Sequence, residues 1–102
     1  MIDPMSCDQA RALLARGAQL VDVRSPAEHA AGALPGAKNL PVEAIYQWVN
    51  QLDPKKPLLL YCRSGARSGA ARNFLRSMGF HEAYNLGAYH QWLGCAETAL
   101  AV

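Results

Sequence analysis

Hydrophobic residues along this chain follow two periods, one typical of helices and one typical of strands. They recur about three or four positions apart in the stretches 10–14, 42–49 and 70–78, which is helical spacing. Between these stretches lie short apolar runs at 19–23 and 58–61 that are rich in strand-forming residues. The pattern therefore predicts helices that alternate with strands.

Capping residues mark where two of the predicted helices begin. Ser6 followed by Gln9 is a capping-box pattern, and Gly17 ends the helix that it starts. Ser25 and Pro26 start a second helix, because proline is favoured at the first helical position. One signal places a helix before the strand predicted at 19–23, and the other places a helix after it.

The run 58–61 is apolar at every position, unlike a strand with one face in water. Central strands of parallel sheets read this way, because helices cover both faces. Weaker strand candidates lie at 37–40 and 81–86, after which Gly87 is expected to turn the chain into a helix near Tyr89–Leu93. Strands alternating with helices favour an α/β domain with a parallel sheet.

Length and charge limit the possible functions. The 102 residues fit a single domain, 1–102, and 51% hydrophobic with 18% charged residues is an ordinary globular composition. A net charge of +2 is too small to indicate nucleic-acid binding. No apolar run approaches the ~20 residues of a membrane span, and the N-terminus lacks a basic leader, so the cytoplasm is the expected compartment. Neither nucleic acid nor a membrane is expected as a partner.

The three cysteines are Cys7, Cys62 and Cys95, and none forms a Cys-x-x-Cys pair or a zinc knuckle. The three histidines show no metal-ligand spacing with them, so no metal or cofactor is expected. In a reducing compartment all three cysteines should be free thiols. Cys7 and Cys95 are interpreted as small buried hydrophobic residues.

Cys62 is different because it stands between the apolar strand at 58–61 and the helix at 70–78. Ligands of open α/β sheets bind beyond the carboxyl ends of the strands. Small residues in the loop let backbone N–H groups converge into an anion-binding nest, to which the helix adds its positive end. The candidate binding residues of this loop are Arg63, Ser64, Gly65, Ala66, Arg67 and Ser68.

The nest, the helix end and the two arginines all favour the thiolate form of Cys62. An ordinary cysteine titrates near pH ~8.5, and helix N-termini with nearby cations lower that value. A pKa about two units lower would raise the thiolate fraction at pH 7 from about 3% to about 75%. The competing interpretation, a core cysteine beside solvated arginines, is less favoured, because arginines at a helix start oppose the helix dipole. Cys62 is therefore the predicted catalytic nucleophile.

Two chemistries use a cysteine between a strand and a helix. Protein-tyrosine phosphatases carry His-Cys-x-x-Gly-x-x-Arg; here Gly65 matches, but Ser68 stands at the arginine position and Tyr61 at that of the histidine. Arg67 lies one residue nearer to Cys62 than the phosphatase arginine does. The shorter loop makes a tighter nest, which suits a sulfur atom better than a phosphate ester. A small phosphatase or arsenate reductase is thus the less favoured alternative.

Three segments of the chain together form a specific pattern. Asp-Val-Arg at 22–24, Glu28 and the Gly-Ala-Leu-Pro-Gly-Ala-Lys-Asn-Leu-Pro segment at 32–41 come first, and Tyr-Cys-Arg-Ser-Gly-Ala-Arg-Ser follows at 61–68. Asn-Leu-Gly-Ala and a tryptophan close the pattern at 85–92. In this order and spacing they resemble single-domain rhodaneses, a family of sulfurtransferases. The departures, at Ala33, Ala88 and His29, lie outside the cysteine loop.

The resemblance implies a rhodanese-like α/β fold with a five-stranded, mainly parallel sheet and helices on both sides. It implies that Cys62 attacks the outer sulfur of thiosulfate, releases sulfite and keeps a persulfide, which cyanide or a thiol then accepts. Arg67, with Arg63, would hold the sulfonate, and backbone N–H groups of the loop would hold the persulfide. Family members that lack the cysteine are inactive binding modules. The alternative is therefore a non-enzymatic sulfur-relay or binding module that serves a sulfur-accepting protein.

The residues outside the loop are assigned roles in the core, in holding the elements together or at the edge of the pocket, and Ser68 in the loop has two candidate roles. Asp22 and Arg24 follow a neighbouring strand and are candidates for the pocket edge, although ion pairs that hold the loops are the favoured interpretation. Glu28 is interpreted as structural and Trp92 as a core residue. The hydroxyl of Ser68 either bonds to the substrate or caps the helix.

Overall fold

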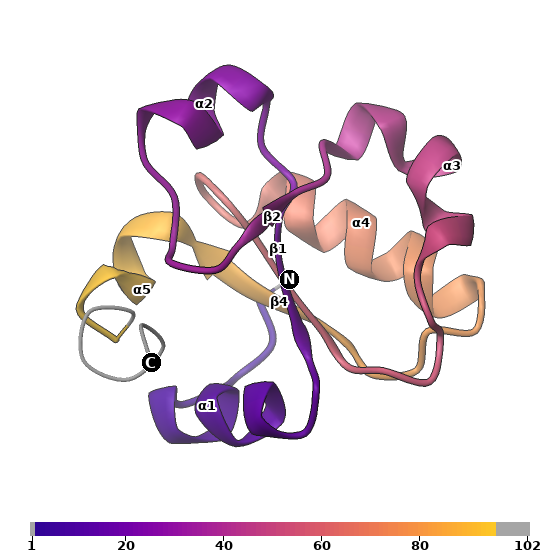
Figure 1. Ribbon diagram of the computed structural model, residues 1–102, viewed down its shortest axis with the longest axis horizontal. Coiled ribbons are helices and arrows are strands. Elements are labelled where there is room, and N and C mark those ends of the chain that lie inside the picture. The colour runs from indigo at the N-terminus through magenta and orange to yellow at the C-terminus, as the bar shows by residue number, and fades with distance from the viewer. Residues whose placement is uncertain (1, 96–102) are drawn as a thin grey trace.

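Four parallel strands form the centre of the molecule, in the order β2-β1-β3-β4 (Figure 1). The structure is a computed structural model that describes residues 2–95. The central pair consists of β1 and β3, and β3 is buried at every position. The strands are β1 (Gln19–Asp22), β2 (Lys38–Asn39), β3 (Leu58–Cys62) and β4 (Ala83–Ala88).

Helices cover both faces of this sheet, as the apolar run at 58–61 indicated (Figure 1). Along β3, Leu58, Leu60 and Cys62 face the cluster that α3 and α4 complete, while Leu59 and Tyr61 face the opposite cluster with α1 and α5. This alternation is the period of two that a strand imposes on its side chains. The helices are α1 (Cys7–Ala15), α2 (Pro26–Ala31), α3 (Ile45–Trp48), α4 (Ala66–Ser77) and α5 (Tyr89–Cys95).

The predicted helix starts are confirmed at α1 and α2. The hydroxyl of Ser6 accepts a hydrogen bond from the N–H of Gln9 at 3.0 Å, and Pro26 stands at the start of α2 behind the capping residue Ser25. The helix predicted at 42–49 is α-helical only over α3, with 3-10 turns before and after it. Its β-branched residues have low helix propensity, which explains the broken geometry.

The sheet has four strands over the described residues, where the resemblance implied five. The N-terminal segment lies beside the outer edge of β4, where the N–H of Asp3 donates to the carbonyl of Asn85 at 2.9 Å. The return bond does not use a backbone carbonyl, because the N–H of Asn85 donates to the Asp3 carboxylate instead, at 2.7 Å. A single backbone bond makes no ladder, so this segment is not a strand.

Gly87 does not turn the chain out of the sheet, contrary to the sequence prediction. It lies within β4 with φ of +94°, and the pairing with β3 passes from Asn85 opposite Leu60 to Gly87 opposite Tyr61. The residue between them, Leu86, is therefore the extra residue of a β-bulge. Bulges bend a strand and are frequent beside active sites.

Cys7 and Cys95 are joined in a disulfide, so the expectation that all three cysteines are free thiols is wrong for this pair. Their Cα atoms lie 5.8 Å apart, although 88 positions separate them in the sequence. The start of α1 and the end of α5 meet because both helices pack on the same face of the sheet (Figure 1). Cys62 is the free cysteine of residues 2–95.

Within residues 2–95, no helix is both long enough and apolar enough to cross a membrane.

Candidate active site

The loop from β3 to α4 wraps around the side chain of Cys62, which has no exposed surface. Gly65 is the residue before α4 and has φ of +98°, a conformation that glycine adopts without strain. A Cβ atom at position 65 would lie 3.1 Å from Ile2 and 3.2 Å from the Cα of Gly87. The glycine thus permits both the turn and the close approach of β4.

Several donors surround the sulfur of Cys62. The N–H of Gly65 lies 3.0 Å from Sγ, the N–H of Ser68 lies 3.5 Å from it, and the Ser68 hydroxyl lies 3.4 Å from it. Burial by itself would raise the pKa of the Cys62 thiol, but hydrogen bonds from the Ser68 hydroxyl and from the N–H groups of Ser68, Ser64 and Gly65 outweigh it and lower the pKa. The loop therefore stabilises negative charge on this sulfur.

The arginine at position 67 is engaged by a carboxylate. Its two terminal nitrogens donate to the two oxygens of Glu28 at 2.7 and 3.0 Å, a bidentate pair that joins α4 to α2. The hydrogen bond from Arg67 lowers the pKa of Glu28 to about 2. A lowered carboxyl pKa means that the pair is complete above pH 4.5 and is lost only as the pH falls toward 2. At neutral pH, Arg67 remains paired with Glu28.

Asp22 lies in a buried network at the end of β1. Its carboxylate accepts hydrogen bonds from the Arg24 guanidinium at 2.9 and 2.7 Å and from the Tyr61 hydroxyl at 3.1 Å, and it lies 3.0 Å from Nδ1 of His29. Burial would raise the pKa of Asp22, but the bonds from Arg24 and His29 hold it below its usual value. The Tyr61 hydroxyl also accepts the N–H of Leu34 at 3.0 Å. The network ties β1, β3 and the segment after α2 together.

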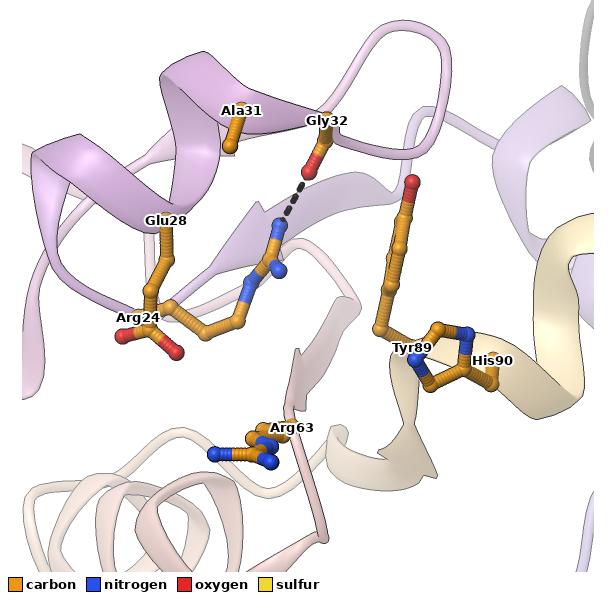
Figure 2. Close-up of a pocket in the computed structure, with 7 residues that line it drawn as sticks. All are labelled: Arg24, Glu28, Ala31, Gly32, Arg63, Tyr89 and His90. Carbon is orange, nitrogen blue, oxygen red and sulfur yellow. Dashed lines mark hydrogen bonds between the residues drawn. The ribbon is translucent and has the colours of Figure 1, made fainter.

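A pocket of about 290 Å³ opens beside the Cys62 loop, between α2 and the start of α5 (Figure 2). The Arg24 guanidinium lies 4.5 Å from the centre of the Tyr89 ring, and donates to the carbonyl of Gly32 at 2.6 Å. Arg63 reaches this pocket from the loop, whereas Cys62 and Asp22 do not line it. The lining residues are Arg24, Glu28, Ala31, Gly32, Arg63, Tyr89 and His90.

Arg63 is the exposed cation of this pocket. In Figure 2 its side chain lies below Arg24 and Tyr89, across the pocket from α2, and over the part of the chain that the structure describes it pairs with no carboxylate. Arg67 and Arg24, by contrast, are bound to Glu28 and Asp22. Arg63 is thus the arginine of the site that is free to meet an anion.

The predicted loop residues fall into two groups, those that contact the sulfur of Cys62 and those on the exposed side of the loop. Gly65 and Ser68 contact the sulfur of Cys62, and Ser64 adds a backbone N–H. The side chains of Arg63 and Ala66 are on the exposed side of the loop. Trp92 is buried and donates its indole N–H to the carbonyl of Leu86 at 2.8 Å, as expected for a core residue.

The sequence analysis gave three residues of the site no role there, although Asn85 belongs to the third segment of the family pattern. Tyr89 and His90 line the pocket because α5 begins directly after β4, and no motif marks them. Asn85 lies under the loop, where its amide bonds to Gly65 and Ser68. The signal for Asn85 was a lone amide inside an otherwise apolar strand, since a buried polar side chain needs partners.

Comparison with known proteins gives a consistent match. Residues 6–95 match the family of the Rhodanese-like domain. A human thiosulfate:glutathione sulfurtransferase is 39% identical, with 87% of this chain and 91% of that protein covered. An uncharacterized protein, YqhL of Bacillus subtilis, is 44% identical over 78% of this chain, which spans 64% of its length.

Solved structures agree with these relatives. A human single-domain sulfurtransferase superposes with a TM-score of 0.70 and 37% identity, over 88% of this chain and 94% of that one. A rhodanese-like domain protein of Staphylococcus aureus superposes with a TM-score of 0.72 and 30% identity, over 84% and 86% of the two chains.

Proposed function

The chain belongs to the family of rhodanese-like domains and is a sulfurtransferase, and we propose that it moves sulfane sulfur from thiosulfate through a persulfide on Cys62. The observation that carries this proposal is the set of N–H and O–H donors around Sγ of Cys62. Such donors stabilise the thiolate before the reaction and the charge on the terminal sulfur after it. The two stages of a covalent transfer therefore use the same loop.

The reaction has two nucleophilic steps. In the first, the Cys62 thiolate attacks the outer sulfur of thiosulfate, a new S–S bond forms, and sulfite leaves with the electrons of the old S–S bond. In the second, cyanide or the thiolate of an acceptor attacks the outer persulfide sulfur, and Cys62 leaves as a thiolate. The acceptor is a small molecule or a protein thiol in this proposal.

A mass measurement tests the covalent step. Incubation with thiosulfate is expected to add one sulfur atom, about 32 Da, to the protein, because Cys62 retains the transferred sulfur. Peptide mapping should place the added mass at Cys62, and cyanide should remove it. A protein that gains no mass, or that gains it at another residue, would refute the proposal.

Access to the sulfur needs a local movement, because Cys62 has no exposed surface. The pocket beside the loop is where a donor is held before that movement, and Arg63 is its exposed cation. A guanidinium offers paired N–H donors that match the oxygens of a sulfonate. Arg67 does not contact the donor directly in this proposal, since its guanidinium stays paired with Glu28.

Replacing Arg63 with alanine is expected to raise the KM for thiosulfate about tenfold, equivalent to ~1.4 kcal/mol of binding free energy. The kcat should change less than the KM, because the donors to Sγ come from other residues. Steady-state kinetics with varied thiosulfate measure both constants.

Lys55→Ala is the matched control, since Lys55 is an exposed cation before β3, at the opposite end of the strand from Cys62. It removes the same charge and should leave both constants unchanged. Equal effects of the two substitutions would mean that Arg63 acts only through the net charge of the protein.

A further inference from the structure

Asn85 is a fully buried amide beneath the Cys62 loop. Its oxygen Oδ1 accepts hydrogen bonds from the Ser68 hydroxyl at 2.6 Å and from the N–H of Gly87 at 2.9 Å. Its Nδ2 donates to the carbonyl of Gly65 at 3.0 Å. A buried amide is stable only with its hydrogen bonds made, so these contacts fix the orientation of the side chain.

Two of these partners are the residues that contact the sulfur. Gly65 offers its N–H to Sγ of Cys62 and its carbonyl to Asn85, and Ser68 lies between Asn85 and Sγ. Asn85 therefore reaches the sulfur through two independent residues without touching it. A displacement of this amide would move donors of the loop together.

The Ser68 hydroxyl has one proton and two acceptors within reach. Oδ1 of Asn85 is 2.6 Å away and Sγ of Cys62 is 3.4 Å away. While Cys62 is a neutral thiol, the shorter bond to Asn85 holds this proton, because an amide oxygen is the better acceptor. When Cys62 becomes a thiolate, the proton can turn to the charged sulfur, and Oδ1 keeps the N–H of Gly87 as its partner.

The backbone of Asn85 is held as firmly as its side chain. Asp3 accepts the N–H of Asn85 through its carboxylate at 2.7 Å and donates its own N–H to the Asn85 carbonyl at 2.9 Å. The carboxylate of Asp3 in turn accepts hydrogen bonds from Arg72 at 2.6 and 3.0 Å. The bulge at Leu86 directs the N–H of Gly87 to the Asn85 amide.

We infer that Asn85 is a positioning residue for Cys62, because its amide fixes Gly65 and, until the thiolate forms, the Ser68 hydroxyl, at positions from which their N–H and O–H groups can donate to negative charge on the sulfur. The effect of Asn85 on the Cys62 thiolate does not depend on which sulfur donor is used. The same donors would also stabilise a persulfide on Cys62, and that extension rests on the proposed function.

The test is the pH dependence of Cys62 alkylation by iodoacetamide in Asn85→Asp. This variant keeps the size of the side chain, but a carboxylate cannot donate to the Gly65 carbonyl, and its charge opposes the thiolate. The midpoint of alkylation is expected to rise by about one pH unit or more above that of the unsubstituted protein. The assay omits reductant, so that Cys7 and Cys95 stay in their disulfide and Cys62 is the thiol that reacts.

Ser68→Ala is the second variant, and it removes one hydroxyl without adding a charge. Its midpoint should also rise, and Asn85→Asp should add less to the midpoint on this background than on the unsubstituted chain, because one of the two routes is gone. If Asn85→Asp does not fold, a rise in Ser68→Ala together with a rise in Asn85→Ser supports the inference. An unchanged midpoint in folded Asn85→Ser overturns it, because this variant removes the amide without adding a charge.

Asn39→Asp is the matched control, since Asn39 is also a strand asparagine whose amide donates to two carbonyls, those of Asp22 and Arg24, at 3.0 and 2.9 Å. It does not contact the Cys62 loop, so its midpoint should equal that of the unsubstituted protein. A purely structural role of Asn85 would lower thermal stability without shifting the midpoint of Asn85→Ser, the neutral variant, whereas a shift in Asn85→Asp includes the effect of its added charge. If the alkylation midpoints rise as expected but thiosulfate adds no mass of about 32 Da to the protein, the proposed function is refuted and the role of Asn85 still holds.

Discussion

Cys62→Ser is expected to lower the rate of sulfur transfer from thiosulfate to cyanide by at least about 1,000-fold. A serine hydroxyl does not ionise near neutral pH and cannot form a persulfide, so the covalent route is lost rather than slowed. The donors at the loop remain, because Gly65 and Ser68 are unchanged. The measurement is the rate of thiocyanate formation at saturating thiosulfate and cyanide.

The control for this substitution is Ser77→Ala, which changes an exposed residue at the far end of α4 from the loop. It should transfer sulfur at the rate of the unsubstituted protein. Cys62→Ser should also unfold in the same transition as the unsubstituted protein. Only the sulfur atom is replaced by oxygen, and the site already supplies hydrogen-bond donors. A folded Cys62→Ser variant that still turns over at more than about one tenth of the normal rate would contradict covalent catalysis.

Removal of the Cys7–Cys95 disulfide is expected to lower the free energy of unfolding by about 4–5 kcal/mol. The bond closes a loop across 88 positions, and closing so long a loop restricts the unfolded chain strongly. Small domains are stable by roughly 5–15 kcal/mol in total, so this is a large share. Urea unfolding of Cys7→Ser/Cys95→Ser against the unsubstituted protein measures the difference.

Reductant provides an internal control for the disulfide. It should destabilise the unsubstituted protein to the level of the double variant and leave the double variant unchanged. Thiol titration of the denatured chain should find one thiol before reduction and three after it, since Cys62 is the free cysteine. Three thiols in the unreduced chain, or equal free energies of unfolding, would show that the bond does not form in solution.

Local patterns predicted most of the secondary structure correctly. The cap at Ser6, the proline at the start of α2 and the fully apolar β3 each appear where expected, because each depends on residues a few positions apart. Gly87 was read wrongly for the same reason. A glycine that turns the chain and a glycine in a bulge have the same local sequence, and only pairing with β3 distinguishes them.

Only part of the candidate site could be predicted from the sequence. The loop after Cys62 is continuous in sequence, so its small residues and its helix start could be read directly. The ion pair of Arg67 with Glu28 could not, because the two residues are 39 positions apart and meet only when α2 lies against the loop. The same is true of the pocket formed by Tyr89 and His90.

The sequence by itself determined the order of the elements and the placement of Cys62 at the end of a buried strand. Periodicity, capping and glycine conformation are properties of neighbouring residues, so they survive without the fold. Three contacts were decided by the tertiary structure alone. They are the disulfide between Cys7 and Cys95, the ion pair of Glu28 with Arg67, and the hydrogen bond of Asn85 to the loop. Each of these contacts joins distant segments, and their meeting depends on how the helices and the β-bulge pack around the sheet.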